Sequence, residues 1–375
     1  MAKAKKEEEK PGKLTSSEIH SLINKKAGFN VAFDLNQENP SAVVDWISTG
    51  STWLDSIIAK GKKAGIPVGR ICELAGAESS GKSYMAAQIA SQAQKKGIQI
   101  VYFDSESAID PEFLEKIGID LSKFVYVQAT SVEFVFKTIE DLLSASEDNR
   151  YLFIIDSFAN IPSEADIEDE EVNPQSSMAK IPRIASLGLK KITLPLANGN
   201  STLLVLNQLR TNLGNQWDPF MTPGGKALIY SYSLRIWLTK KTGKDDYVIN
   251  DQNGFRVGSE VKVKLKKSRF GTESRECLFK IIWGSDPVGI RDEESWLDAI
   301  RNSDRLKIKG AWKALVLNDG SEVSFQDANW IEKLKDPKFK ESVLFIIDEE
   351  VVQKFKDKAG NAKLFYDIVP DGNKL

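Results

Sequence analysis

The octet GAESSGKS at residues 76–83 constrains this chain more than any other stretch, because it fits the pattern G-x-x-x-x-G-K-[ST] in full. It follows an apolar run, ICELAG, that predicts a strand, and it precedes apolar residues at helical spacing. In that context the glycines let backbone N–H groups surround phosphates at the N-terminus of a helix. A chance glycine-rich turn is the alternative, and the flanking strand and helix argue against it.

The loop supplies side chains as well as backbone donors. Lys82 would place its charge beside the β- and γ-phosphates, and the Ser83 hydroxyl would ligate Mg²⁺. The sequence therefore predicts a nucleotide and Mg²⁺ as cofactors. The predicted nucleotide-binding residues in and beside the octet are Gly76, Ala77, Glu78, Ser79, Ser80, Gly81, Lys82, Ser83 and Tyr84.

Around the loop, the chain alternates between strand and helix patterns from about residue 47 to residue 282. Near-continuous apolar runs at 98–104, 151–156 and 202–208 are typical of buried parallel strands. Residues 261–267, VKVKLKK, alternate instead and predict an antiparallel strand added at the later side of the sheet. We therefore expect an α/β core.

Shorter segments flank this core. Thr15 and Glu18 have the spacing of a capping box and predict a short helix, and residues 29–35 alternate like a strand. From about residue 285 the composition shifts to Trp, Lys and Asp. The predicted organisation is a solvated tail (1–13), a helix and strand (14–46), the core (47–284) and a small C-terminal domain (285–375).

Composition excludes several classes of protein. The two cysteines, Cys72 and Cys277, cannot form a disulfide framework, and they favour a reducing, cytoplasmic setting. The single histidine, His20, argues against a histidine-centred triad or metal site. No apolar run approaches the ~20 residues that span a bilayer. The net charge of −2 means that any basic surface is local.

Carboxylates follow two of the apolar runs. Asp156 ends the run 151–156 and is the natural partner of Mg²⁺ through a water, although an Asp at a strand end is often only a cap. Glu106 follows the run 98–104 and can polarise a water for attack on the γ-phosphate. Asp104 competes with Glu106 for this role, and the residues alone leave the choice open.

Two later segments point to further partners. Gln208 and Arg210 end the run 202–208 and precede a long polar loop that carries Leu213, Trp217 and Phe220. Exposed apolar groups in such a loop suit contact with nucleic-acid bases, and packing of Trp217 into the protein is the alternative. The basic cluster KLKKSRFG (264–271) is either a solvated face or a phosphate contact, to nucleic acid or to ATP across a subunit boundary.

These landmarks occur in the order found in the RecA family of recombinases, and the chain resembles the bacterial members and their phage relatives. The resemblance covers about residues 45–289. It rests on ISTGSTWLD (47–55), PVGRICELAGAESSGKS (67–83), FDSESAIDPEFLEKIGID (103–120), IIDSFANI (154–161), NQLR with GGKAL, and KKSRF, with KGAW (309–312) beyond them.

The resemblance implies a RecA-like P-loop NTPase core with a mostly parallel sheet. It also implies a small N-terminal helix–strand polymerisation element and a small C-terminal α/β domain. The polymerisation strand would be anchored by Phe29, in the F-x-x-A pattern of FNVA, or by Phe33. The implied function is a DNA-dependent ATPase that forms ATP–Mg²⁺ helical filaments on single-stranded DNA. Such a protein catalyses homologous pairing and strand exchange with double-stranded DNA.

The resemblance also assigns roles to residues. It chooses Glu106 over Asp104 as the group that activates water, and it makes Gln208 the sensor of the γ-phosphate. Asp110 and Phe113 fall where the family contacts adenine. The predicted catalytic set also contains Lys82, Lys267 and Arg269. By the resemblance, Lys267 and Arg269 would reach the ATP of the neighbouring subunit.

Two DNA loops are implied, at about 166–182 and 210–225. Pro182 is unexpected where the family is helical, and it leaves the start of that helix open. The predicted DNA-binding residues are Met178 as a wedge, Arg183, Ser186 and Lys190 on phosphates, Arg210, Leu213, Gly224 and Gly225 in the second loop, and Arg235 after it.

Two alternatives remain at this stage: a hexameric helicase of the same core fold, and an ATP-locked scaffold that binds DNA with little hydrolysis. The expected partners are single- and double-stranded DNA, further copies of the chain, and mediator or single-strand-binding proteins, with no membrane. The expected location is the bacterial cytoplasm or a phage-infected host cell.

Overall fold

The chain folds as two compact units, residues 1–44 and 45–375. The structure, a computed structural model, describes residues 13–28, 31–37, 39, 42–58, 65–107, 109–145, 148–168, 174–211, 220–240, 248–286 and 288–351. For residues 168, 174–179, 240, 350 and 351 it describes the backbone alone.

The N-terminal unit contains the helix α1 (Ser16–Ala27). Thr15 and Glu18 form the predicted capping box, with the Glu18 carboxylate 2.8 Å from the Thr15 backbone nitrogen. Glu18 therefore satisfies a donor that the helix start leaves unpaired. The helix ends at Gly28, whose φ of 79° suits glycine. The prediction of a short capped helix is confirmed.

The strand predicted at 29–35 is not present in residues 31–35, and residues 29 and 30, including Phe29, lie outside the described residues. The reason is local: Asn24 Oδ1 accepts the N–H groups of Val31 and Ala32, at 2.8 and 2.7 Å. Those N–H groups would pair with another strand in a sheet. A strand at this position requires the edge of another sheet, which its own short unit does not offer.

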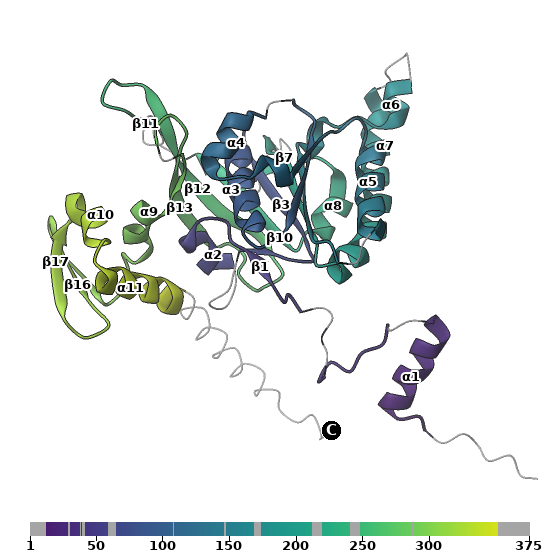
Figure 1. Ribbon diagram of the computed structural model, residues 1–375, viewed down its shortest axis with the longest axis horizontal. Coiled ribbons are helices and arrows are strands. Elements are labelled where there is room, and N and C mark those ends of the chain that lie inside the picture. The colour runs from purple at the N-terminus through teal and green to yellow at the C-terminus, as the bar shows by residue number, and fades with distance from the viewer. Residues whose placement is uncertain are drawn as a thin grey trace, which may run out of the picture. The chain divides into compact units, whose positions relative to one another are not determined.

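The second unit is built on one large sheet (Figure 1). In its described part the sheet has ten strands, in the order β14-β13-β12-β10-β3-β7-β6-β4-β5, with β11 paired to β12. The parallel strands are β10 (Leu234–Lys240), β3 (Ile71–Gly76), β7 (Thr202–Gln208), β6 (Tyr151–Asp156), β4 (Gln99–Asp104) and β5 (Phe124–Gln128). The three predicted parallel strands are therefore confirmed.

Antiparallel strands extend the sheet beyond β10. They are β12 (Arg256–Ser268), β13 (Glu276–Ile282), β14 (Gly289–Arg291) and β11 (Val248–Asn250). The alternating segment 261–267 lies in β12, as predicted. Small antiparallel pairs also form between β1 (Trp46–Ile47) and β2 (Ile66–Pro67), and between β8 (Arg210–Thr211) and β9 (Phe220–Met221).

Helices cover both faces of the sheet because residues of the buried strands alternate between two apolar cores. Cys72 and Leu74 of β3 belong to one core, and Ile71 belongs to the other. The first core packs against α2 (Thr52–Ile58), α3 (Lys82–Gln94) and α4 (Pro111–Ile117). The second packs against α5 (Val132–Ala145), α7 (Pro174–Asn198) and α8 (Gly225–Ser231), and α5 and α7 lie side by side in Figure 1.

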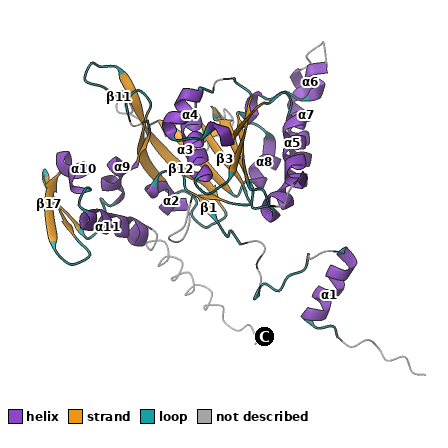
Figure 2. Cartoon of the chain, in the orientation of Figure 1, coloured by secondary structure: helices purple, strands orange, loops and turns teal. Residues whose placement is uncertain are grey.

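A third apolar core, from Trp296 to Ile347, belongs to the C-terminal region. It lies among α9 (Asp292–Ala299), the antiparallel sheet β15 (Leu306–Lys309), β16 (Trp312–Val316) and β17 (Glu322–Gln326), and the helices α10 (Trp330–Lys333) and α11 (Pro337–Ile346). Figure 2 shows these helices and strands beside the large sheet. Short helical turns occur at η1 (Leu121–Lys123), η2 (Phe158–Asn160), η3 (Asp327–Asn329) and η4 (Ile347–Val351). The α/β fold with a small C-terminal domain is as predicted.

No helix in the described part of the chain has the length and apolar character that a membrane crossing requires.

Candidate active site

The phosphate loop joins β3 to α3, and its glycines are required by geometry. Gly81 has a φ of 91°, in the left-handed region, at the start of α3. A Cβ on Gly76 would lie 2.2 Å from the Ser80 Oγ and 2.9 Å from the carbonyl oxygen of Leu238. Neither position therefore tolerates a side chain without moving the loop.

The polar groups of the loop fit a nucleotide phosphate. The Lys82 Nζ donates to the carbonyl oxygens of Gly76 and Ala77, at 3.2 and 3.0 Å, and so folds back over the loop. Burial lowers the pKa of Lys82, while the charges of Asp156, Glu106 and Glu78 oppose this shift. Ser80 Oγ is buried and has no hydrogen-bond partner among the described residues. A bound phosphate would add negative charge beside Lys82.

Ser83 and Asp156 meet where the Mg²⁺ site was predicted. The Ser83 Oγ donates to the Asp156 Oδ2 at 2.8 Å, and the Tyr102 hydroxyl donates to the same oxygen at 2.5 Å. Burial raises the pKa of Asp156, and the two hydrogen bonds oppose that shift. A hydroxyl and a carboxylate side by side fit Mg²⁺, which is commonly held by one or two carboxylates together with phosphate oxygens and waters.

Glu106 and Asp104 occupy different environments. Asp104 is buried, and its Oδ1 accepts the backbone N–H groups of Glu106 and Ser107, at 2.8 and 3.0 Å. Glu106 is exposed and lines the same pocket as Lys82. Asp104 thus stabilises the turn that carries Glu106, and its own carboxylate is occupied by that turn. Of the two carboxylates, Glu106 is therefore the better candidate to activate a water in the pocket.

A pocket of about 420 Å³ joins these groups. Because the carboxyl ends of β3, β4, β6 and β7 lie at one edge of the sheet, Lys82, Glu106, Asp156 and Gln208 all reach it. The residues that line the pocket are Glu78, Ser79, Ser80, Gly81, Lys82, Ser83, Tyr84, Glu106, Asp156, Gln208, Arg256 and Trp283. Two of the predicted loop residues, Gly76 and Ala77, are not among these lining residues.

Arg256 and Trp283 were not predicted. Arg256 starts β12, Trp283 follows β13, and the guanidinium carbon lies 5.2 Å from the centre of the indole ring. Tyr84 continues this wall, with ring centres 5.8 Å from Trp283 and 4.4 Å from Phe113. An aromatic wall of this kind suits a nucleobase. Neither predicted adenine contact is among the lining residues: Phe113 lies behind Tyr84 in this wall, and Asp110 caps α4 through the Glu112 N–H.

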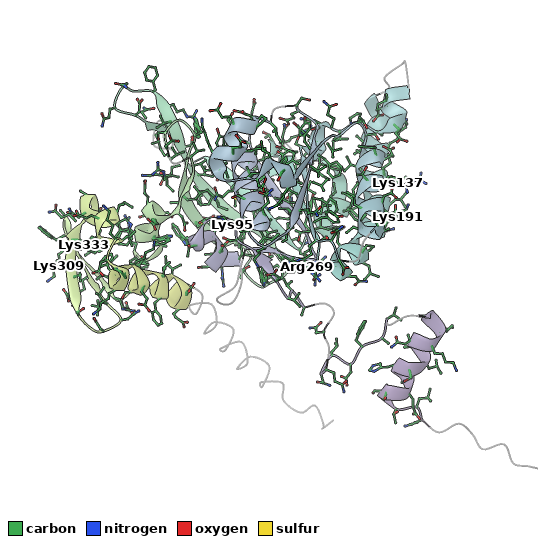
Figure 3. The ribbon with its side chains drawn as sticks, in the orientation of Figure 1. Lys95, Lys137, Lys191, Arg269, Lys309 and Lys333 are labelled. Carbon is green, nitrogen blue, oxygen red and sulfur yellow. The ribbon has the colours of Figure 1, made fainter. Side chains whose placement is uncertain are left out.

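Lys267 and Arg269 lie away from this pocket. Lys267 pairs with Arg235, which pairs with Glu73, a residue three positions before Gly76 on β3. Lys267 is therefore about 10 Å back along the strands from the start of the phosphate loop. Both cations bind the C-terminal end of α8: Lys267 Nζ lies 2.8 Å from the Ile229 carbonyl oxygen, and Arg269 lies 2.9 Å from that of Tyr230. Figure 3 labels Arg269 on this part of the molecule.

The region of the first predicted DNA loop is largely helical. The helix α6 (Glu164–Glu168) precedes residues 169–173, which lie outside the described residues, and α7 begins at Pro174. The helix runs through Pro182, so the doubt about a helix at this proline is resolved: its ring packs on Gly225, where a Cβ would lie 3.0 Å from the Pro182 Cβ.

On α7, Arg183 and Lys190 are exposed and Ser186 is half-buried. Their spacing places all three on one face of the helix. Met178 lies in α7, and its side chain is outside the described residues. This face could therefore follow a phosphate backbone.

The ends of the second predicted loop are described, but Leu213 and Trp217 lie outside the described residues. Arg210 is exposed on β8, which pairs with β9, and Phe220 is 42 % exposed. Gly224 and Gly225 have φ angles of 99° and 78° at the start of α8. The loop therefore closes on a short antiparallel pair and a glycine turn.

Arg235 does not occupy a position that suits its predicted contact with DNA. It is 6 % exposed, and its Nε donates to the buried Glu73 Oε2 at 2.6 Å. Its guanidinium also donates to the Thr222 Oγ1 at 3.0 Å, and Asn207 bridges Glu73 to the Pro223 carbonyl oxygen. Arg235 therefore neutralises the buried Glu73 carboxylate, and through Thr222 it holds the end of the second loop.

Comparisons of the sequence with known proteins give one family and several relatives. The family described as the RecA N-terminal domain matches residues 15–288. The chain is 30 % identical to "Protein RecA" of Acinetobacter baylyi over 342 residues, which are 90 % of this chain and 92 % of that protein. It is 31 % identical to "Protein RecA" of Wigglesworthia glossinidia brevipalpis over 73 % of this chain and 78 % of the relative. For "Protein RecA" of Fusobacterium nucleatum the identity is 31 %, over 78 % of this chain and 73 % of the relative.

Proposed function

The chain belongs to the RecA family, and on that premise we propose that it is a DNA-dependent ATPase and recombinase. With ATP and Mg²⁺ it assembles into helical filaments on single-stranded DNA. The filament then pairs that strand with homologous duplex DNA and exchanges strands, in recombination and repair.

One observation carries this proposal: a single pocket contains the phosphate loop, the two residues expected to bind Mg²⁺ and the candidate general base. In that pocket Lys82 would neutralise charge on the phosphates of ATP, and Ser83 and Asp156, which are hydrogen-bonded to each other, would hold Mg²⁺. Glu106 orients and deprotonates the attacking water. Gln208 ends β7 at the same pocket and precedes the second loop, so it can report the γ-phosphate to that loop.

Lys267 and Arg269 complete the site of the next subunit. Their distance from the pocket of their own chain supports a role in trans, because they face the end of α8 and not the phosphate loop. Hydrolysis then removes the γ-phosphate that both subunits contact. The interface between the subunits weakens, and the filament loosens.

In the proposed complex, DNA lies along two segments: the first predicted loop with α7, and the second predicted loop at about 210–225. Arg183, Ser186 and Lys190 on α7 bind phosphates, Met178 acts as a wedge, and Arg210, Leu213 and the glycines 224 and 225 form the second contact. Affinity for single strands should therefore fall steeply with salt, since each neutralised phosphate releases counterions.

The first test is imaging of the full chain with single-stranded DNA and a non-hydrolysable ATP analogue, together with a joint-molecule assay. Open helical filaments and joint molecules support the proposal. Closed rings that unwind forked DNA without strand exchange would identify a helicase of the same core.

The scaffold alternative is tested by hydrolysis. We expect single-stranded DNA to stimulate ATP turnover, and Glu106→Gln to abolish the stimulated rate. Turnover that is low and unchanged by Glu106→Gln would mean that the chain binds DNA without an ATPase cycle.

A further inference from the structure

Glu106 is tied to the turn that follows the magnesium strand. Its Oε1 accepts two hydrogen bonds, from the Ser157 Oγ at 3.1 Å and from the Asn160 Nδ2 at 2.7 Å. A carboxylate oxygen has about two lone-pair directions, so these donors set the plane of the carboxylate. The orientation of the candidate base is therefore set by Ser157, between β6 and η2, and by Asn160 of η2, as well as by its own turn.

The turn that carries these donors is itself well fixed. Ser105 Oγ accepts the Ser157 N–H at 2.9 Å, and Ser105 N donates to the Asp156 carbonyl oxygen at 2.8 Å. Phe158 is buried, and the Asn160 N–H closes the turn on the Ser157 carbonyl oxygen at 3.2 Å. Asn160 itself is exposed. Its short side chain thus links the turn directly to Glu106.

Both proposed DNA-binding segments reach this turn. A Cβ on Gly224, at the end of the second segment, would lie 3.1 Å from the Phe158 Cε1, so the glycine packs directly on the Phe158 ring. On the other side the chain passes through Ile161 and Ser163, both buried, and Ser163 caps α6 before the first segment. The turn at η2 is therefore in contact with the end of the second segment and continuous in the chain with the start of the first.

We propose that Asn160 is a positioning residue that couples the orientation of Glu106 to the two DNA-binding segments. The inference rests on the proposed function and adds the connection by which DNA alters hydrolysis. When DNA docks, η2 shifts, and the Asn160 amide shifts the Glu106 carboxylate relative to the attacking water. Without this amide, Glu106 loses the stronger of its two ties to the turn.

The test is the ratio of ATP turnover with and without single-stranded DNA, in wild type and in Asn160→Ala. We expect the ratio to fall about tenfold or more, the factor that corresponds to the loss of one hydrogen bond to a charged group. The KM for ATP and the affinity for single-stranded DNA should stay within twofold of wild type. Asn160 does not line the ATP pocket, and it is not one of the proposed DNA-binding residues. Asn160→Asp, which keeps the shape but removes the N–H donor, should lower the ratio as well.

Two controls make the outcome decisive. Asn160→Gln, which restores an amide donor, should recover part of the ratio, and Asn318→Ala, at an exposed asparagine of the C-terminal domain, should leave it unchanged. A ratio unchanged in Asn160→Ala, or one that falls only together with ATP or DNA affinity, would overturn the inference. Absence of DNA stimulation in the wild type would instead overturn the proposed function.

Discussion

The buried pair between Glu73 and Arg235 leads to a prediction that separates a structural role from a DNA contact. Replacing Arg235 by Leu removes the guanidinium and leaves the Glu73 carboxylate, which is 0 % exposed, with Asn207 as a donor at 3.2 Å. Breaking a buried ion pair by removing one partner costs about 3–5 kcal/mol. The core at residues 47–284 has an unfolding entropy of about 0.5 kcal/mol/K, at about 2.1 cal/mol/K per residue. The Tm should therefore fall by roughly 6–10 °C.

The assay is a thermal melt followed by circular dichroism, combined with the salt dependence of binding to single-stranded DNA. For Arg235→Leu we expect the lower Tm and an unchanged salt slope. The double variant Glu73→Met/Arg235→Met should regain most of the lost stability, because replacing both charges removes the unpaired carboxylate.

Arg183→Leu is the matched control, because Arg183 is exposed on α7. Its Tm should stay near that of the wild type, while the slope of log affinity against log salt should lose about 0.7, the contribution of one phosphate contact on a single strand. An Arg235→Leu variant with an unchanged Tm and a reduced slope would refute the structural role of Arg235.

Three further predictions concern single residues. Glu106→Gln should lower kcat in the presence of DNA by about 10²–10⁴-fold, the usual contribution of a general base, with nucleotide affinity retained; an equal loss of affinity would contradict this role. Gly224→Ala should weaken binding to single-stranded DNA and lower Tm, because φ is 99° and the new Cβ would lie 2.1 Å from the Leu228 Cδ1; anisotropy and a melt that match the wild type would show that the turn adapts freely. Burial raises the pKa of Asp55 to about 7, so the folded protein keeps a proton that the unfolded chain releases above about pH 4. Stability should therefore decline as pH rises between these values, and the Tm gain of Asp55→Asn over wild type should be larger at pH 7.5 than at pH 5; an equal gain at both would argue against this assignment.

The sequence was most informative where chemistry follows a strand end. The phosphate loop, Glu106, Asp156 and Gln208 could be placed because carboxyl ends of parallel strands share one edge of the sheet. The roles of Lys267 and Arg269 came from resemblance, and the structure adds their distance from the pocket of their own chain.

Other features depend on contacts that no local pattern reveals. Arg235 and Glu73 are 162 residues apart in the sequence, so the burial of this arginine could not be inferred from its charge. Arg256 reaches the pocket because β12 starts at residue 256, before the alternating pattern at 261–267. The predicted strand at 29–35 failed in residues 31–35 because strand pairing needs a second edge, and Asn24 occupies the backbone N–H groups of Val31 and Ala32.

The central claim, that each ATP site is completed by the next subunit, is tested most directly by mixing two inactive variants. Glu106→Gln lacks the base but supplies Lys267, whereas Lys267→Ala supplies Glu106 but lacks the cation given to its neighbour. We predict that each variant alone has little DNA-stimulated ATP turnover. An equimolar mixture on single-stranded DNA should recover up to about a quarter of the wild-type rate, since about one interface in four joins an intact base to an intact cation in a random filament. A mixture no more active than the two variants measured separately would contradict the account.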